Sequence, residues 1–141
     1  MKSKRVIRGR LSDNEQRRIV VDDGNFNDGW RIIRFIAAGD ATNTNEVSAK
    51  VSLKPVTTTG WDWSKNTEIA WSSSRNTAEA NWGGFPNAVD PSAVIVADLY
   101  VTGTSSANGD INFMIEIERV ALSDDQAILA LIQERAQDDF N

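Results

Sequence analysis

The sequence contains neither cysteine nor histidine. Without cysteine there are no disulfides or thiolate nucleophiles, and without both residues there are no Cys/His zinc sites. Catalytic arrangements of the Ser-His-Asp or Cys-His kind are excluded as well. Any catalysis would depend on carboxylates, lysine, tyrosine or a hard metal ion. We therefore expect a protein that is not an enzyme and that uses no cofactor.

Long apolar runs are also missing. No run approaches about 18 residues, so the sequence predicts no membrane span. The basic start, MKSKRVIRGR, lacks the apolar stretch of a secretory signal, and we expect the protein to stay where it is made or to leave by lysis. The 141 residues, of which 40% are hydrophobic and 25% charged, are typical of one folded domain.

What the sequence does contain is an alternation of apolar and polar residues, the signal of half-buried strands. In EVSAKVSLK the apolar residues from Val47 to Leu53 share one face, and the polar residues from Ser48 to Lys54 share the other, which we expect to face water. INFMIEIERV alternates in the same way, and the nearly apolar AVIVADLYV predicts a central strand. Shorter strand candidates are RVIRGR, QRRIVVDD, WRIIRFIAA and TEIAWSSS.

Turn residues separate these segments, and several short strands at this spacing predict an all-β fold, an antiparallel β-sandwich of jelly-roll type, over residues 1–122. Residues 72–88 show no period and predict a long loop. Residues 123–141 predict an amphipathic helix, with Ser123 and Gln126 forming a capping box. This helix would pack on its own sheet or on a neighbouring subunit.

Charge is distributed unevenly along a chain of net charge −5. The first 18 residues are basic and the last 19 are acidic. The two ends are either simply solvated, or the basic end of one subunit meets the acidic end of another, which would set register. For that contact we single out Arg5, Arg8 and Arg10 on the basic side, and Asp138 and Asp139 on the acidic side.

The basic end has two further interpretations. Its arginines would also neutralise nucleic-acid phosphates, although the acidic chain as a whole makes such contact minor. They would equally suit an edge strand whose charges discourage aggregation.

Four of the five tryptophans lie between Gly60 and Phe85. Trp61 and Trp63 are two residues apart and project from one face of an extended segment, while Trp82 precedes two glycines in the predicted loop. Trp71 lies in a strand candidate, where we expect it to be buried. The others suit anchors of a protein interface or a sugar-binding platform. A base-stacking platform is disfavoured because few basic residues are nearby.

Two clusters of acidic residues are the remaining candidate sites. Glu116 and Glu118 share one strand face, which we interpret as solvated because an acid/base pair needs a cleft and divergent pKa values. The oxygen-rich segment from Asp22 to Asp28 lacks the spacing of an EF-hand, so a turn capped by its own side chains is favoured over a calcium site. The sequence thus predicts no metal site.

Several segments carry a resemblance, in order along the chain: VIRG, VVDDGNFNDGWRIIRF, NTEIAWSSS, AVDPSAVIVADLYVTG and INFMIEIERVALSDDQAILALIQERAQDD. Over nearly its whole length the chain resembles a family of small uncharacterised proteins that tailed phages of marine bacteria encode among genes for virion structure. The resemblance implies a virion component, such as a capsid, decoration or tail-associated subunit, found in the virion and in the host cytoplasm during assembly. The family has no catalytic motif, so no site residue is carried over.

Together these observations predict a non-enzymatic structural subunit that associates with copies of itself, as a homo-oligomer, and with other virion proteins. Trp61, Trp63 and Trp82 are the expected anchors. The alternative is a carbohydrate-binding module for host attachment.

Overall fold

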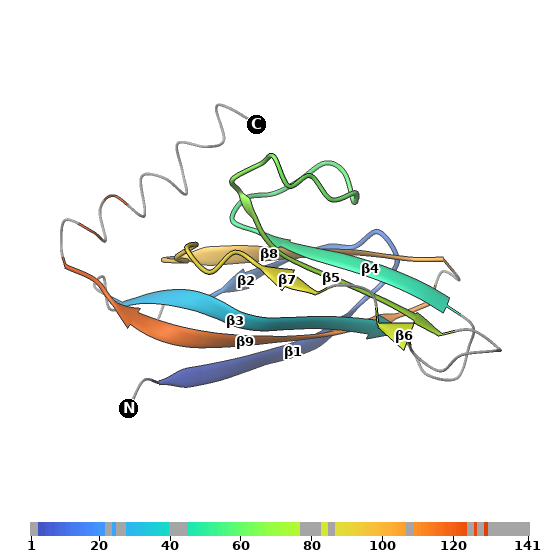
Figure 1. Ribbon diagram of the computed structural model, residues 1–141, viewed down its shortest axis with the longest axis horizontal. Coiled ribbons are helices and arrows are strands. Elements are labelled where there is room, and N and C mark those ends of the chain that lie inside the picture. The colour runs from blue at the N-terminus through green and yellow to red at the C-terminus, as the bar shows by residue number, and fades with distance from the viewer. Residues whose placement is uncertain are drawn as a thin grey trace.

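The computed structural model describes residues 3–21, 24, 28–39, 45–76, 83–84, 87–106, 109–123, 126 and 129. In these residues nine strands form two antiparallel sheets, so the predicted all-β class is confirmed. Figure 1 shows the sheets as two layers, with β1, β3 and β9 below and β2, β4, β5 and β8 above. The arrangement is sandwich-like.

The smaller sheet, called sheet A here, has the order β1-β9-β3. Its strands are β1 (Lys4–Leu11), β9 (Ile111–Ala121) and β3 (Asp28–Gly39). In the central strand β9, every second residue from Ile111 to Ile117 is buried, so the predicted alternation is confirmed. A β-bulge in β3 between Ile32 and Arg34 leaves Ile33 outside the regular pairing.

The larger sheet, called sheet B here, has the order β2-β8-β4-β5-β6, with β7 also paired to β5. Its strands are β2 (Gln16–Val20), β8 (Asp98–Ser105), β4 (Asn45–Ser52), β5 (Glu68–Asn76), β6 (Gly83–Gly84) and β7 (Ala88–Val89). Two predictions need correction. The strand expected in AVIVADLYV begins only at Asp98, and the range 72–88, expected to be a loop, contains the end of β5, all of β6 and the first residue of β7.

The two sheets enclose one core. Phe35 and Ile115 come from sheet A, and Val51 and Leu99 from sheet B; all four belong to the same buried cluster. Polar contacts join the sheets along one side, where the Ala37 amide donates to Ser72 Oγ at 2.9 Å and Ser74 Oγ donates to the Ala37 carbonyl at 2.9 Å. Because Ser72 bridges two layers, this side of the sandwich is closed by hydrogen bonds as well as by packing.

The start of β3 is also joined to the segment that precedes β8. Trp30 and Ile95 form an isolated antiparallel bridge, in which the Trp30 amide donates to the Ile95 carbonyl at 2.8 Å and the Ile95 amide donates back at 2.7 Å. Trp30 and Ile95 are both buried. The residues just before β8 therefore extend sheet A by a single bridge before the chain crosses to sheet B.

A glycine next to this bridge gives the first prediction. A Cβ atom at Gly29 would lie 2.6 Å from Val94 Cγ1, so Gly29→Ala should overpack the crossing and lower the free energy of unfolding by about 1–3 kcal/mol. Urea unfolding followed by tryptophan fluorescence measures this change. Gly60→Ala is the matched control because a Cβ there meets nothing within 4 Å. Equal stability of the two variants would contradict the close packing of Gly29 against Val94.

After β9 the chain reaches the predicted capping box, and this box is present. The Gln126 amide donates to Ser123 Oγ at 3.2 Å, and the Ser123 amide donates to Gln126 Oε1 at 3.0 Å. Apart from Gln126 and Leu129, the predicted helix beyond Ser123 lies outside the described residues.

Candidate functional site

The site is built by the loop that joins β4 to β5, residues 53–67, on the outer face of sheet B. The pairing of β4 with β5 sets Val51 beside Ala70 on the core face, and therefore sets Lys50 beside Trp71 on the outer face. The Leu53 amide donates to the Thr67 carbonyl at 2.8 Å and closes the base of the loop. In Figure 1 the loop lies above sheet B, on the side away from sheet A.

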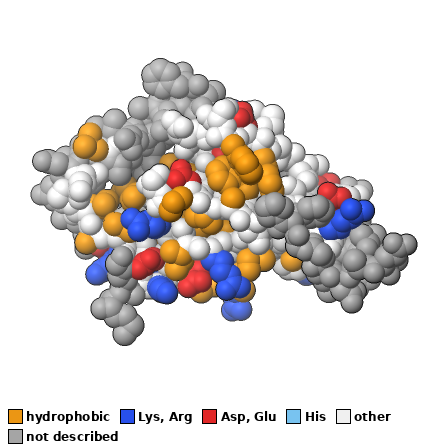
Figure 2. Space-filling model, in the orientation of Figure 1, with side chains coloured by type: hydrophobic (Ala, Val, Ile, Leu, Met, Phe, Trp, Pro, Cys, Tyr) orange, Lys and Arg blue, Asp and Glu red, His pale blue; other side chains and the backbone are white. Residues whose placement is uncertain are grey.

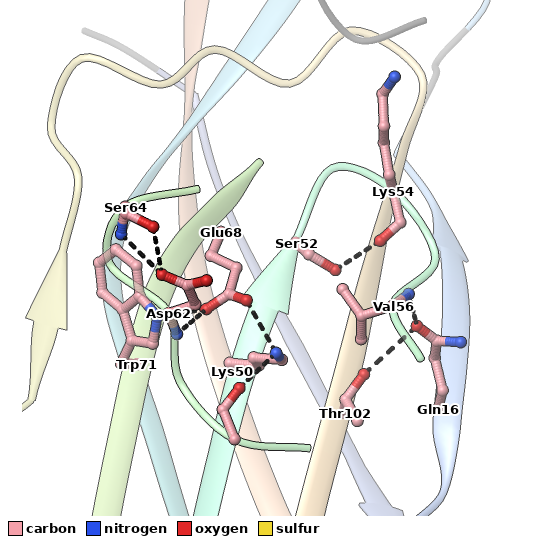
Figure 3. A network of polar contacts seen from close by, with 11 residues as sticks. Gln16, Lys50, Ser52, Lys54, Val56, Asp62, Ser64, Glu68, Trp71 and Thr102 are labelled. Atoms are coloured by element: carbon pink, nitrogen blue, oxygen red, sulfur yellow. Dashed lines mark hydrogen bonds and ion pairs between the residues drawn. The ribbon is translucent and has the colours of Figure 1, made fainter. Parts of the chain in front are cut away.

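A buried ion pair holds this loop against the sheet. Lys50 Nζ lies 2.8 Å from Glu68 Oε2, and each side chain is only 1% exposed. Lys50 also donates to the Gly60 carbonyl at 2.6 Å. Glu68 Oε1 accepts from the Asp62 amide at 2.8 Å and from Trp71 Nε1 at 3.2 Å. The pair thus binds two loop residues, Gly60 and Asp62, to two neighbouring strands (Figure 3).

From Lys50 to Lys54 the polar face that begins in β4 is therefore not in water, and there the prediction was wrong, whereas Ser48 is only half-buried. Lys50, Ser52 and Lys54 are all buried. The physical reason is the loop, which covers this face and supplies partners for the polar groups; for example, Ser52 Oγ donates to the Lys54 carbonyl at 2.7 Å. A second anchor lies further along, where the Val56 amide donates to Gln16 Oε1 of β2 at 2.7 Å.

Three indoles form a cluster at this loop: Trp61 and Trp63 belong to the loop, and Trp71 belongs to β5. The rings of Trp61 and Trp63 are nearly parallel, at an interplanar angle of 17° with centroids 6.4 Å apart. Trp63 also contacts Trp71, with centroids 5.8 Å apart and a tilt of 60°. Trp71 is buried, as predicted, whereas Trp63 is 66% exposed. The cluster consequently presents one large, supported aromatic ring to solvent.

A carboxylate lies between the two stacked indoles in sequence. Asp62 Oδ1 accepts from the amide of Ser64 at 3.0 Å and from its hydroxyl at 2.5 Å. These bonds, the hydroxyl bond first, hold the pKa of Asp62 below its ordinary value against the opposing effect of desolvation, and the nearby charges of Lys65 and Lys50 act in the same direction as the bonds. Asp62 is therefore negatively charged at neutral pH, next to the exposed ring.

The predicted basic residues all lie on β1 but do not act alike. Arg5 is used within the chain, because its guanidinium lies 5.2 Å from the centroid of the Trp30 ring and donates to the Val21 carbonyl at 3.4 Å. Arg10 donates to Asn112 Oδ1 at 3.0 Å and lies 3.6 Å from Asp110. Arg8 is exposed and, among the described residues, forms no ion pair.

The remaining predicted interface residues, Trp82, Asp138 and Asp139, lie outside the described residues. The structure therefore brings together Trp61 and Trp63, and it places the arginines of β1 on the other sheet. Sequence reasoning missed Lys50 and Glu68. The only signal was two charged residues in otherwise core-forming strands, and it does not reveal that residues 18 apart in sequence form a pair.

The described residues contain no group of three His, Cys, Asp or Glu side chains arranged to hold a metal ion. Asp28, the described end of the oxygen-rich segment, lies 3.7 Å from Arg119. Within the same part of the chain, no helix has the length and apolar character that crossing a membrane requires.

Comparison of the chain with protein-family models, with curated proteins and with solved structures found no match.

Proposed function

We propose that this protein is a non-enzymatic structural subunit, a virion component as its resemblance implies, and that it assembles by docking the aromatic loop of residues 53–67 onto a neighbouring subunit. The observation that carries the proposal is Trp63, which is 66% exposed although it is the largest kind of side chain and is held by two further indoles. Burying an exposed indole in a contact removes a large apolar area from solvent, which is favourable.

The rigidity of the loop supports a docking role. Binding loses less free energy to ordering when a contact residue is already fixed in its bound geometry. Here the loop is fixed by the Lys50–Glu68 pair beneath it and by the Asp62 amide bond to Glu68. Tryptophan on such a support is a frequent hot spot of protein interfaces.

The order of strand pairs supports the predicted jelly roll as the scaffold. β1 pairs with β9, β2 with β8, and β4 with β5, while β3 is bridged to Ile95 just before β8. These four pairs are nested, as in a long hairpin rolled into two sheets. Jelly rolls of this kind form viral capsid subunits and also lectins. The capping box at Ser123 supports the helix proposed for the C-terminal segment.

The alternative of a carbohydrate-binding module has one observation in its favour, the nearly parallel rings of Trp61 and Trp63, since sugars stack on indole faces. Assembly is favoured because the faces of these two rings are partly used against each other and against Trp71.

The second prediction tests the proposal. Trp63→Ala should weaken self-association by about 2 kcal/mol, roughly thirtyfold, because it removes the hot-spot ring. Trp63→Phe should retain part of the association. Sedimentation velocity over a concentration series measures both, and far-ultraviolet circular dichroism checks that the fold is intact.

Two results would contradict assembly through this loop. One is a Trp63→Ala variant that associates as wild type does. The other is a wild-type monomer at all concentrations that binds on a glycan array and loses this binding on replacement of Trp63, which would establish the sugar platform.

A further inference from the structure

The outer face of sheet A is a second exposed surface, and its composition follows from the strand register. Four rows of three residues cross the sheet from β1 through β9 to β3. They are Lys4–Glu118–Arg31, Val6–Glu116–Arg34, Arg8–Met114–Ile36 and Arg10–Asn112–Ala38. This face therefore carries five basic side chains and two glutamates, although the whole chain has a net charge of −5.

The cations on this face are only partly neutralised. Lys4 lies 4.0 Å from Glu116. Arg8 and Arg34 are both exposed, and within the described part of the chain neither of them forms an ion pair. Near the centre of the face these two guanidiniums are therefore free to meet an anion or an aromatic ring.

Apolar side chains lie between the cations. Val6 is 57% exposed and Met114 is 39% exposed, and Ile33 of the bulge is exposed as well. Figure 2 shows this mixture along the lower part of the molecule, where β1 and β9 lie in Figure 1 and basic, acidic and hydrophobic side chains alternate. The outer face of sheet A thus places exposed apolar side chains beside arginines that form no ion pair within the described part of the chain.

The aromatic loop has the complementary chemistry and lies on the opposite side of the sandwich. It presents the exposed Trp63 ring next to the ionised Asp62 carboxylate, on the outer face of sheet B. An indole packs well on aliphatic side chains and on guanidinium planes, and a carboxylate pairs with arginine. One face of the molecule therefore carries the groups that the other face would recognise.

We propose that the outer face of sheet A is the docking surface for the Trp61–Asp62–Trp63 loop of a second copy of this chain. The proposal rests on the proposed assembly function and names its partner surface. Trp63 packs over Val6 and Met114 of the next copy, and Asp62 pairs with Arg8 or Arg34. Because the two surfaces differ and lie on opposite faces, the contact is head-to-tail and propagates into rows of subunits.

A symmetric contact is disfavoured by charge. Two sheet A faces in contact would bring the unpaired arginines of both copies together, and like charges across an interface cost free energy. Head-to-tail docking instead brings the Asp62 carboxylate of one copy to the arginines Arg8 and Arg34 of the next.

A mixing experiment tests the inference. One variant, Trp63→Ala, lacks the loop anchor, and a second, Arg8→Glu with Arg34→Glu, lacks the basic face. Each alone should associate at least about tenfold more weakly than wild type. Mixed in equal amounts they should form dimers that grow no further, since each mixed pair has one intact junction. Sedimentation velocity distinguishes these dimers from the wild-type rows.

A matched control distinguishes the loss of this docking face from the general effect of a changed net charge. Arg75 is an exposed arginine on β5 of sheet B, so Arg75→Glu alters the charge as Arg34→Glu does but leaves the docking face intact. It should associate as wild type does, whereas Arg34→Glu alone should not.

The possible outcomes distinguish failure of this inference from failure of the proposed function. If Trp63→Ala abolishes association while the arginine variant associates normally, the loop docks elsewhere and only the present inference fails. If neither variant affects association, the proposed function fails with it. A monomeric wild type that binds duplex DNA through Arg8 and Arg34 would assign the face to a polyanion and overturn the inference.

Discussion

Replacing Lys50 with methionine is expected to destabilise the protein by about 3–5 kcal/mol, because it leaves the Glu68 carboxylate buried and without its counter-charge. The ammonium lies 2.8 Å from that carboxylate, and both side chains are 1% exposed. Water cannot reach the site to replace the lost partner. The free energy of unfolding, measured with urea and tryptophan fluorescence, reports the change.

The double variant Lys50→Met with Glu68→Gln is the control for this experiment. Glutamine keeps an oxygen that accepts from the Asp62 amide and from Trp71 Nε1, and no buried charge remains. We expect the double variant to be more stable than Lys50→Met alone. If the second substitution instead added to the loss, the cost of Lys50→Met would come from lost packing and not from an unpaired charge.

Replacing Phe35 with alanine should have an effect of similar size, about 3–5 kcal/mol, through the cavity it leaves in the core. Phe35 is 2% exposed and belongs to the buried cluster shared by both sheets. Its neighbour Ile33 lies in the bulge of β3 and is exposed. Ile33→Ala should therefore change stability by less than about 1 kcal/mol.

Thermal unfolding followed by circular dichroism compares these two variants on one strand. A large loss of stability for Ile33→Ala together with a small loss for Phe35→Ala would mean that β3 turns its other face to the core.

The strands were predictable because their residues alternate. In β9 the period of two is unbroken from Ile111 to Ile117, and in β4 the apolar residues Val47, Ala49 and Val51 do face the core. The limits of β8 were not predictable. AVIVADLYV is apolar throughout, so its composition does not mark the point near Ile95 where the chain leaves one sheet for the other.

The candidate site was predicted in part. The pairing of Trp61 with Trp63 followed from their spacing, and the burial of Trp71 from its strand. The burial of Lys50 did not follow, because alternation shows only which face of a strand a residue occupies. Whether that face meets water or a loop depends on a tertiary contact, here the cover of residues 53–67. The free arginines Arg8 and Arg34 likewise gain significance only from the register that aligns β1 and β3 across β9.

Within the described residues β1 is one of the two outer strands of sheet A, and it carries Lys4, Arg5, Arg8 and Arg10. Two such edges repel one another, which keeps sheets of separate molecules from merging into a continuous ribbon. Dissolved salt shortens the reach of that repulsion from about 10 Å at 0.1 M to about 3 Å at 1 M. A high salt concentration should therefore loosen the proposed rows of subunits, whose junctions pair arginine with carboxylate, and should at the same time permit irregular edge-to-edge association. Ionic strength would thus select between the proposed docking and the pairing of sheet edges.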